Sequence, residues 1–390
     1  MGIENKLNKM TQQTNLSLKK LKGIKPKCVK TKSESRLSKL VVDCRDFVGE
    51  CNSKELIHTM EWIRTNLDRH PKRKELFKKL NITQPDLENF IDIMSDLMLD
   101  CEESNYTGIY SGFLLDYLSE QERKKGQPSK FLFNGTGRSF NYLFANSKKI
   151  DRLILNNFKG DNVLYLAGRD LENPANYIYV NNLVGNQNIV SSGSTFIDLL
   201  VGTNCSGEGF MRGAGNLMGR IGLLVADNIK GNLALASVGG RGGNCAFTIA
   251  TNIEGESTLA DFCGNLGDSN FLYMENIEGP DILRKDEIER TFPGLNKPLD
   301  LVACKNVKFG SNEYRLDINN LVEYKKQKQK FNELKNKYRV EEILTKVRSI
   351  KTPDESTFDI LDDLNNIYVN MYEQIPESKK KKQKIINNKK

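Results

Sequence analysis

Hydrophobic residues in the middle of the chain occur in short runs that end at the same four-residue pattern. This pattern, Asn-apolar-x-Gly, recurs at Asn157, Asn182, Asn204, Asn228, Asn252 and Asn276, with successive spacings of 25, 22, 24, 24 and 24 residues. Three residues before the Asn stands a β-branched or aromatic residue, such as Ile154, Tyr179 or Val201. Runs of this composition predict short β-strands that each end at a polar corner.

A second apolar segment follows the Gly, for example Val163–Leu166 and Leu233–Ala236, and is interpreted as a second strand of each repeat. Eleven residues after the Asn, most repeats have a Gly, which suits a corner that needs positive φ. A repeat of this length cannot bury its apolar face alone, but stacked repeats share one core. The sequence therefore predicts an α+β fold with a single-stranded parallel β-solenoid of about 7-8 coils over residues 130–316. A Gly-rich antiparallel β-sandwich is the main alternative.

Equivalent Asn side chains would lie above one another in such a solenoid. Each amide is then expected to donate to the carbonyl of the neighbouring Asn, as in the side-chain ladders of stacked sheets. The predicted ladder contains Asn157, Asn182, Asn204, Asn228, Asn252 and Asn276.

Both flanks carry helical patterns. Residues 33–125 are predicted to form a helical bundle, including a stripe from Leu87 to Cys101, that covers the open edge of the first coil. Residues 317–375 are predicted to form a C-terminal helical arm that begins with one long polar helix over residues 318–350. Packing of this helix alongside the solenoid is favoured over oligomerisation through a coiled coil, because lysines interrupt its heptads.

The formal net charge of +8 is unevenly distributed. Residues 1–40 contain 11 Lys and Arg against 2 acids, and residues 379–390 contain 7 Lys and no acid, which leaves −8 between them. Disordered basic arms are predicted over residues 1–32 and 376–390, and such arms bind polyanions, including nucleic acid, without sequence preference. The candidate polyanion-binding residues are Lys19, Lys20, Lys22, Lys379, Lys380, Lys381 and Lys382. A purely solubilising role is the alternative.

Residues with recognisable catalytic chemistry are sparse. The chain has only two histidines, His58 and His70, and its 8 cysteines form no Cys-x-x-Cys pair, so no metal site is predicted. The Gly-rich stretches Gly213–Gly219 and Gly239–Gly243 open no amphipathic helix, so no cofactor is predicted either. The cysteines of the solenoid are interpreted as core residues.

Carboxylates offer the only enzymatic interpretation. Glu254 and Glu278 share one position of the repeat, and Glu208 and Glu256 share another. Paired carboxylates catalyse glycoside hydrolysis, so these four are weak catalytic candidates. The competing and favoured interpretation is a solvated acidic surface, because residues 150–280 contain 13 acids and 7 bases spread along the repeats.

The glycine-rich stretches Gly207–Gly219 and Gly231–Gly243 resemble the repeats of two known β-helices. These are the C-terminal β-helix of glutamate synthase large subunits and the β-helix of formylmethanofuran dehydrogenase C subunits. The resemblance covers the solenoid only, and it implies a structural, subunit-arranging role without catalytic residues.

The favoured function is a non-enzymatic scaffold or adaptor that binds an unknown protein partner along the solenoid. One alternative is a carbohydrate- or nucleotide-sugar-directed enzyme with its site at the four glutamates. Another is a nucleic-acid-associated factor that acts through the basic arms. Because the sequence shows neither a secretory signal nor an apolar run suited to a transmembrane segment, a cytoplasmic protein is expected.

Overall fold

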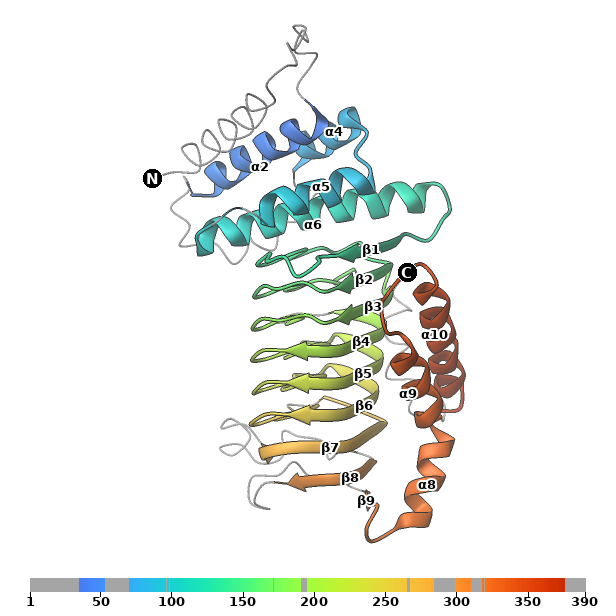
Figure 1. Cartoon of the computed structure of the whole chain (residues 1–390). Helices are drawn as coiled ribbons and strands as arrows, with labels where there is room; N and C mark the ends of the chain where they lie inside the picture. Colours follow the sequence, from blue (N-terminus) through green and yellow to red (C-terminus); the bar gives the residue numbers. More distant parts are fainter. Residues whose placement is uncertain are drawn as a thin grey trace, which may run out of the picture.

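The protein is a β-solenoid with helices at one end and along one side (Figure 1). The computed structural model describes residues 35–52, 70–95, 97, 99–170, 172–190, 195–264, 267–283, 299, 301–309, 318 and 320–375. Lys19, Lys20, Lys22 and Lys379–Lys382 of the predicted basic arms lie outside the described residues, as does His58.

One strand from each coil joins a single parallel sheet of nine strands, in the order β1 to β9 and with about seven turns of solenoid. The strands are β1 (Lys130–Asn134), β2 (Arg152–Asn156), β3 (Ala175–Asn181), β4 (Phe196–Ser206), β5 (Arg220–Lys230), β6 (Asn244–Glu254), β7 (Phe271–Ile282), β8 (Val302–Phe309) and β9 (Leu321–Glu323). Equivalent positions of the repeat pair directly, so that Val201 lies opposite Val225, and Val225 opposite Ile249. The predicted α+β solenoid fold is therefore confirmed.

The strands bury both faces of the sheet. Leu200 and Leu224 face the interior of the solenoid, where the core continues into the helical cap. Leu199, Val201 and Leu223 face outwards and pack beneath the C-terminal helices. Burial on both faces explains why the strands are almost continuously apolar.

The predicted helical bundle covers the first coil. Its described helices are α2 (Arg36–Asn52), α4 (Pro71–Leu80), α5 (Gln84–Ser95) and α6 (Cys101–Lys124). The stripe that was expected to continue from Leu87 to Cys101 is divided between α5 and α6. Gly108 and Gly112 allow α6 to lie directly on this coil, since a Cβ atom there would come within 2.3 Å of the Tyr142 carbonyl oxygen and 2.4 Å of the Ala145 carbonyl oxygen.

The prediction of one long helix over residues 318–350 is wrong. The segment forms β9, α8 (Lys328–Lys337) and α9 (Val340–Ser349), with Arg339 in the left-handed region at φ 50°. At about 100° per residue, a straight helix would place the apolar residues of α8 and those of α9 on opposite sides. The break allows both Phe331 of α8 and Val347 of α9 to pack on the sheet.

The second apolar segment of each repeat is not a strand, contrary to the prediction. In Val163–Leu166, residues Leu164 and Leu166 have φ angles of 57° and 58°, and Leu233 and Leu235 of a later coil have 56° and 58°. Alternating left-handed residues cannot form a β-strand. The segment is instead a stack of turns, in which the Leu164 N–H donates to the Leu143 carbonyl of the preceding coil, 2.8 Å away.

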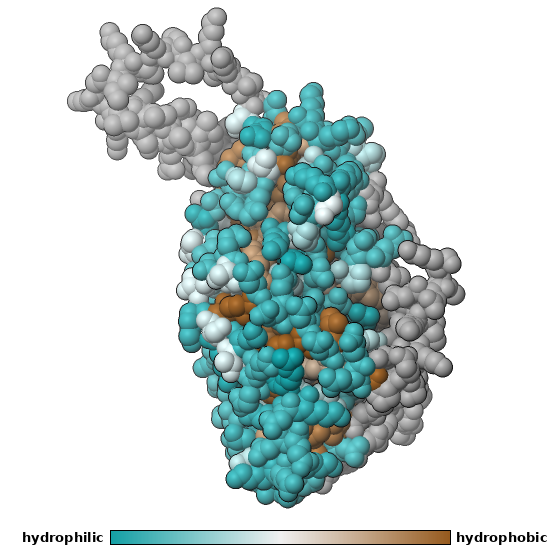
Figure 2. Space-filling model, turned by 90° about the vertical axis from the view of Figure 1, so that its right-hand side faces the viewer, coloured by the Kyte–Doolittle hydropathy of each residue, from teal (hydrophilic) through white to brown (hydrophobic). Residues whose placement is uncertain are grey.

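The arm is completed by α10 (Thr357–Glu373), which lies beside α9 along the sheet (Figure 1). Its apolar side faces the sheet, whereas the outward face of the arm is mainly hydrophilic (Figure 2). The expectation that the arm packs alongside the solenoid is confirmed. Within the described residues, no helix combines the length and apolar character that crossing a membrane requires.

Candidate functional site

The Asn-apolar-x-Gly motifs form an exposed edge where the strands of the sheet end. We call this edge the corner ridge. It consists of the motif Asn of each coil, the residue two positions later and the residue four positions later. From β4 to β7 these residues are Asn204, Ser206, Glu208, Asn228, Lys230, Asn232, Asn252, Glu254, Glu256, Asn276, Glu278 and Pro280. Most of them are exposed, and neighbouring coils repeat them in register.

The motif Asn has a backbone role that sequence reasoning missed. Every Asn of the motif adopts the left-handed conformation, with φ between 52° at Asn252 and 59° at Asn228. Apart from Gly, Asn tolerates this conformation best, because its short side chain forms local hydrogen bonds. The chain therefore turns sharply at Asn while the next residue, such as Ile253, still points into the core.

Amide hydrogen bonds connect many of these Asn residues between coils. In each bond the Asn Nδ2 group donates to the Oδ1 atom of the Asn in the preceding coil. The pairs are Asn182 to Asn157 at 2.9 Å, Asn228 to Asn204 at 2.7 Å, and Asn276 to Asn252 at 3.0 Å. The other two steps differ. Asn204 donates to Asn181, and Asn252 donates to the carboxylate of Asp227.

The Gly of the motif is required by the distance between coils. A Cβ atom at Gly207, Gly231 or Gly279 would lie 1.9–2.0 Å from the carbonyl oxygen of the Gly in the preceding coil. No side chain fits at this distance. The ridge therefore has a fixed shape, because neighbouring main chains touch along it.

The four candidate catalytic glutamates lie on this ridge in two columns. Glu254 and Glu278 are directly opposite in the β6–β7 register, and Lys230 of β5 lies 3.5 Å from Glu254. Glu208 and Glu256 are separated by the coil of Asn232, whose side chain accepts a hydrogen bond from the Glu256 N–H at 2.9 Å. All four are exposed, and none of them lines the clefts of about 800, 360 and 230 Å³ found among the described residues.

A column of polar residues beneath the C-terminal helices was not predicted. Arg348 of α9 donates from Nε and Nη2 to the two carboxylate oxygens of Asp227 in β5, at 2.9 and 3.0 Å. Burial raises the pKa of Asp227, but hydrogen bonds from Arg348 and Thr251 outweigh it and hold that pKa below its ordinary value. Sequence offered one signal, because Asp227 interrupts an apolar strand pattern one residue before the motif.

The same column continues at Glu275 in β7. Its carboxylate accepts hydrogen bonds from the Tyr273 hydroxyl at 2.6 Å and from the Lys305 ammonium at 2.5 Å. Burial raises the pKa of Glu275, but the hydrogen bonds from Lys305 and Tyr273 reverse the effect and lower it. Arg348 attaches the arm to this column, whereas the bonds of Glu275 connect β7 to β8.

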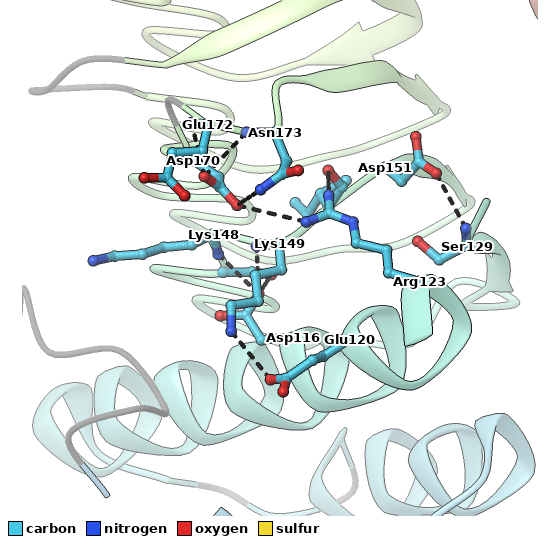
Figure 3. Close-up of polar contacts among 12 residues, drawn as sticks. Asp116, Glu120, Arg123, Ser129, Lys148, Lys149, Asp151, Asp170, Glu172 and Asn173 are labelled. Carbon is cyan, nitrogen blue, oxygen red and sulfur yellow. Dashed lines mark hydrogen bonds and ion pairs between the residues drawn. The ribbon is translucent and has the colours of Figure 1, made fainter. Parts of the chain in front are cut away.

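The junction between α6 and the first coil holds a second polar network (Figure 3). Asp116 is buried, and its Oδ1 atom accepts hydrogen bonds from the Ser147 hydroxyl and from the N–H groups of Lys148 and Lys149, at 2.7–2.8 Å. One turn earlier, the Ser111 hydroxyl accepts from the Phe144 N–H at 2.9 Å. In later coils, such N–H groups donate to carbonyl groups of the preceding coil. The first coil has no preceding coil, so side chains of α6 accept these hydrogen bonds instead.

The two carboxylates of this junction differ in charge behaviour. Burial raises the pKa of Asp116 to about 6, despite the hydrogen bond from Ser147. Burial also raises the pKa of Glu120, but Lys124, Lys74 and Lys149 surround it and lower that pKa to about 2. Further along α6, Arg123 donates to Asp170 and to the Ile150 carbonyl, which ties the helix to the next coil.

The other residues with reactive side chains are placed structurally. The His70 ring lies 5.6 Å from the Phe47 ring and 5.1 Å from the Phe113 ring, in the core of the cap. Burial raises the pKa of the Cys205 and Cys245 thiols to about 12, so both stay protonated. In the part of the chain that the structure describes, no three His, Cys, Asp or Glu residues gather as a metal site would need.

Comparison with known proteins gives no relative: no family model, curated protein or solved structure matches the chain.

Proposed function

We propose that this protein is a non-enzymatic scaffold or adaptor, and that its protein partner docks along the corner ridge. The proposal rests on the observation that the chain covers some surfaces of the solenoid with its own helices and leaves the ridge uncovered. The cap covers the first coil, and α8, α9 and α10 cover the outer face of the sheet. The ridge runs the length of the solenoid without such a cover on its described residues.

The ridge is suited to binding because its shape is fixed before a partner arrives. Its main chain is held by contacts between the coils, and its Asn side chains are oriented by hydrogen bonds. A rigid surface loses little conformational entropy on binding. Amides and carboxylates project from it in columns, and successive residues of a column are about 4.8 Å apart, the spacing of neighbouring strands.

The charge of the ridge indicates the chemistry of the partner. Glu254, Glu256 and Glu278 lie close together on the ridge, and Lys230 pairs with Glu254 at 3.5 Å. We expect a partner with a basic, hydrogen-bonding face. The resemblance of the glycine-rich corners to the β-helix of glutamate synthase supports this proposal, since that domain arranges subunits.

The finer parts of the proposal concern location and the basic arms. We infer a cytoplasmic protein whose lysine-rich ends contact polyanions while the ridge holds the partner. The carbohydrate-directed alternative gains no support from the ridge. Among the described residues, the large hydrophobic side chains that are exposed include no aromatic ring on which a sugar could stack.

The test is affinity capture with matched variants, followed by mass spectrometry. The ridge variant is Glu254→Gln with Glu278→Gln, and the control is Glu333→Gln with Glu355→Gln on the C-terminal arm, where both residues are exposed. We expect a protein that wild type and control capture and the ridge variant does not. Capture of the same proteins by all three would contradict the proposal.

A further inference from the structure

A cleft of about 800 Å³ lies where the helical cap meets the first two strands of the sheet. The loop between α4 and α5 and the last turn of α6 form one wall, and β1 and β2 form the other. The volume is within the range of clefts that bind small molecules, about 300–1,000 Å³. Neither the corner ridge nor the arm contacts explain it.

Two cations lie directly opposite each other on the strand wall. Lys130 of β1 pairs in register with Arg152 of β2, and both side chains line the cleft. Like charges at opposed positions of neighbouring strands repel and destabilise a sheet. A negative charge close to both side chains would offset this repulsion.

The chain supplies that compensation only in part. Asp362 of α10 accepts a hydrogen bond from Arg152 Nη1 at 2.8 Å, but the buried Nε atom of Arg152 has no hydrogen-bond partner. The Lys130 ammonium lies 5.5 Å from the centre of the Phe358 ring, and it forms no ion pair with any described carboxylate. A third cation, Lys125, is paired with Glu122 at 2.7 Å.

The wall opposite the two cations is rich in carboxamides. Gln84, Gln121 and Gln127 line it, and within the described residues the side chains of Gln121 and Gln127 form no hydrogen bond. Carboxamides both donate and accept, so they suit hydroxyl and amide groups of a ligand. The strand wall thus offers positive charge, and the helix wall offers carboxamides beside the paired side chains of Lys125 and Glu122.

We propose that this cleft binds a small polar molecule that carries phosphate or carboxylate groups. The anionic group lies against Lys130 and Arg152, and the polar remainder contacts the glutamines. The site belongs to the solenoid and cap together, so its occupation stabilises the junction between them. It is independent of the partner proposed for the corner ridge.

The test uses pyrophosphate and citrate as probes on the full chain. Each is titrated at constant ionic strength while the melting temperature is recorded, because a ligand of the folded state raises it with concentration. The cleft variant is Lys130→Gln, and the control is Lys325→Gln, which removes an exposed lysine between β9 and α8 that does not line the cleft. Both variants keep the lysine-rich ends, so binding there cancels in the comparison.

We expect at least one probe to raise the melting temperature of wild type and control, with an apparent Kd about ten-fold weaker in Lys130→Gln. A response to pyrophosphate alone identifies phosphate as the anionic group, and a response to citrate alone identifies carboxylate. The proposal is overturned if neither probe acts on wild type, or if Lys130→Gln responds as strongly as the control.

Discussion

Arg348 of α9 and Asp227 of β5, 121 residues apart in the chain, form a two-point ion pair beneath the C-terminal arm. The Asp227 side chain is 9% exposed, and its Oδ1 atom also accepts hydrogen bonds from the Thr251 hydroxyl and the Asn252 amide. The pair therefore joins the arm, the sheet and the Asn column of the ridge at one point.

Replacing Arg348 is expected to loosen the arm. Arg348→Ala leaves the nearly buried carboxylate of Asp227 without its cation, which is expected to lower the free energy of unfolding by about 1–3 kcal/mol. The measurement is urea denaturation followed by circular dichroism. The control is Lys346→Gln on the same helix, whose exposed pair with Asp363 contributes less than about 1 kcal/mol. Equal losses in the two variants would show that the buried pair has no special role.

The Gly column of the ridge is expected to reject any side chain. Gly231→Ala places a Cβ atom 2.0 Å from the Gly207 carbonyl oxygen, so coils must move apart, at a cost of more than about 2 kcal/mol. Gly49→Ala in α2 is the control, because no atom lies within 4 Å of its added Cβ. There we expect a gain of about 0.5–1 kcal/mol from helix propensity. Thermal unfolding of both variants checks the contrast.

Two variants of Asn228 separate its backbone role from its amide hydrogen bond. Asn228→Gly keeps the left-handed conformation and loses only the bond to Asn204, at a cost of about 1 kcal/mol. Asn228→Ala loses the bond and also strains the backbone, which adds about 1–2 kcal/mol. Equal stability of the two variants would mean that the backbone conformation at Asn228 is unimportant.

The buried carboxyl of Asp116 predicts a pH dependence of stability. Because burial raises its pKa to about 6, the folded protein keeps this proton at a pH where the unfolded chain has lost it. Asp116 therefore makes stability fall as the pH rises between about 4 and 6. Asp116→Asn lacks this effect. As the pH rises across that window, its free energy of unfolding should therefore increase relative to that of wild type by up to about 3 kcal/mol.

Denaturation midpoints of wild type and Asp116→Asn at a series of pH values test this prediction. Glu120 does not interfere. Its pKa is lowered from 4.5 to about 2, so its contribution to stability is lost only as the pH falls below about 4.5. Parallel pH profiles for the two proteins would show that Asp116 titrates as an exposed carboxyl does.

Removal of the basic ends tests polyanion binding. A chain without residues 1–32 and 379–390 loses an excess of positive charge, so it should elute from heparin at a much lower salt concentration than the full chain. The acidic segment between the ends is expected to give little retention. Unchanged elution would assign any polyanion binding to the folded part.

The solenoid could be predicted because its core positions obey a repeat. Cys205, for example, stands where other coils have Ile229 and Ile253, and all three are buried in the same column. Residues whose role depends on a neighbouring coil repeat with it, so one sequence contains many copies of the same signal.

The arm was less predictable because its structure depends on what it contacts. The break at Arg339 allows the apolar stripes of α8 and α9 to face the same sheet. This reason becomes visible only when the angular positions of the two stripes around one helix axis are compared. The alternating left-handed residues of Val163–Leu166 were also missed, because leucine rarely adopts positive φ and its presence therefore does not predict this conformation. The pairing of Arg348 with Asp227 involves neither repetition nor local spacing.

The course of α10 has a consequence for how the protein unfolds. At one end Phe358 lies beside Tyr177 of β3, and further along Tyr368 lies beside Phe247 of β6. Stacked repeats usually fray from a free end, because each contacts only its neighbours. A helix braced against strands three coils apart couples those coils, so none of them can peel away without releasing it. Since α10 follows every strand of the solenoid in the chain, the solenoid gains this cooperativity only after all of its coils have been synthesised.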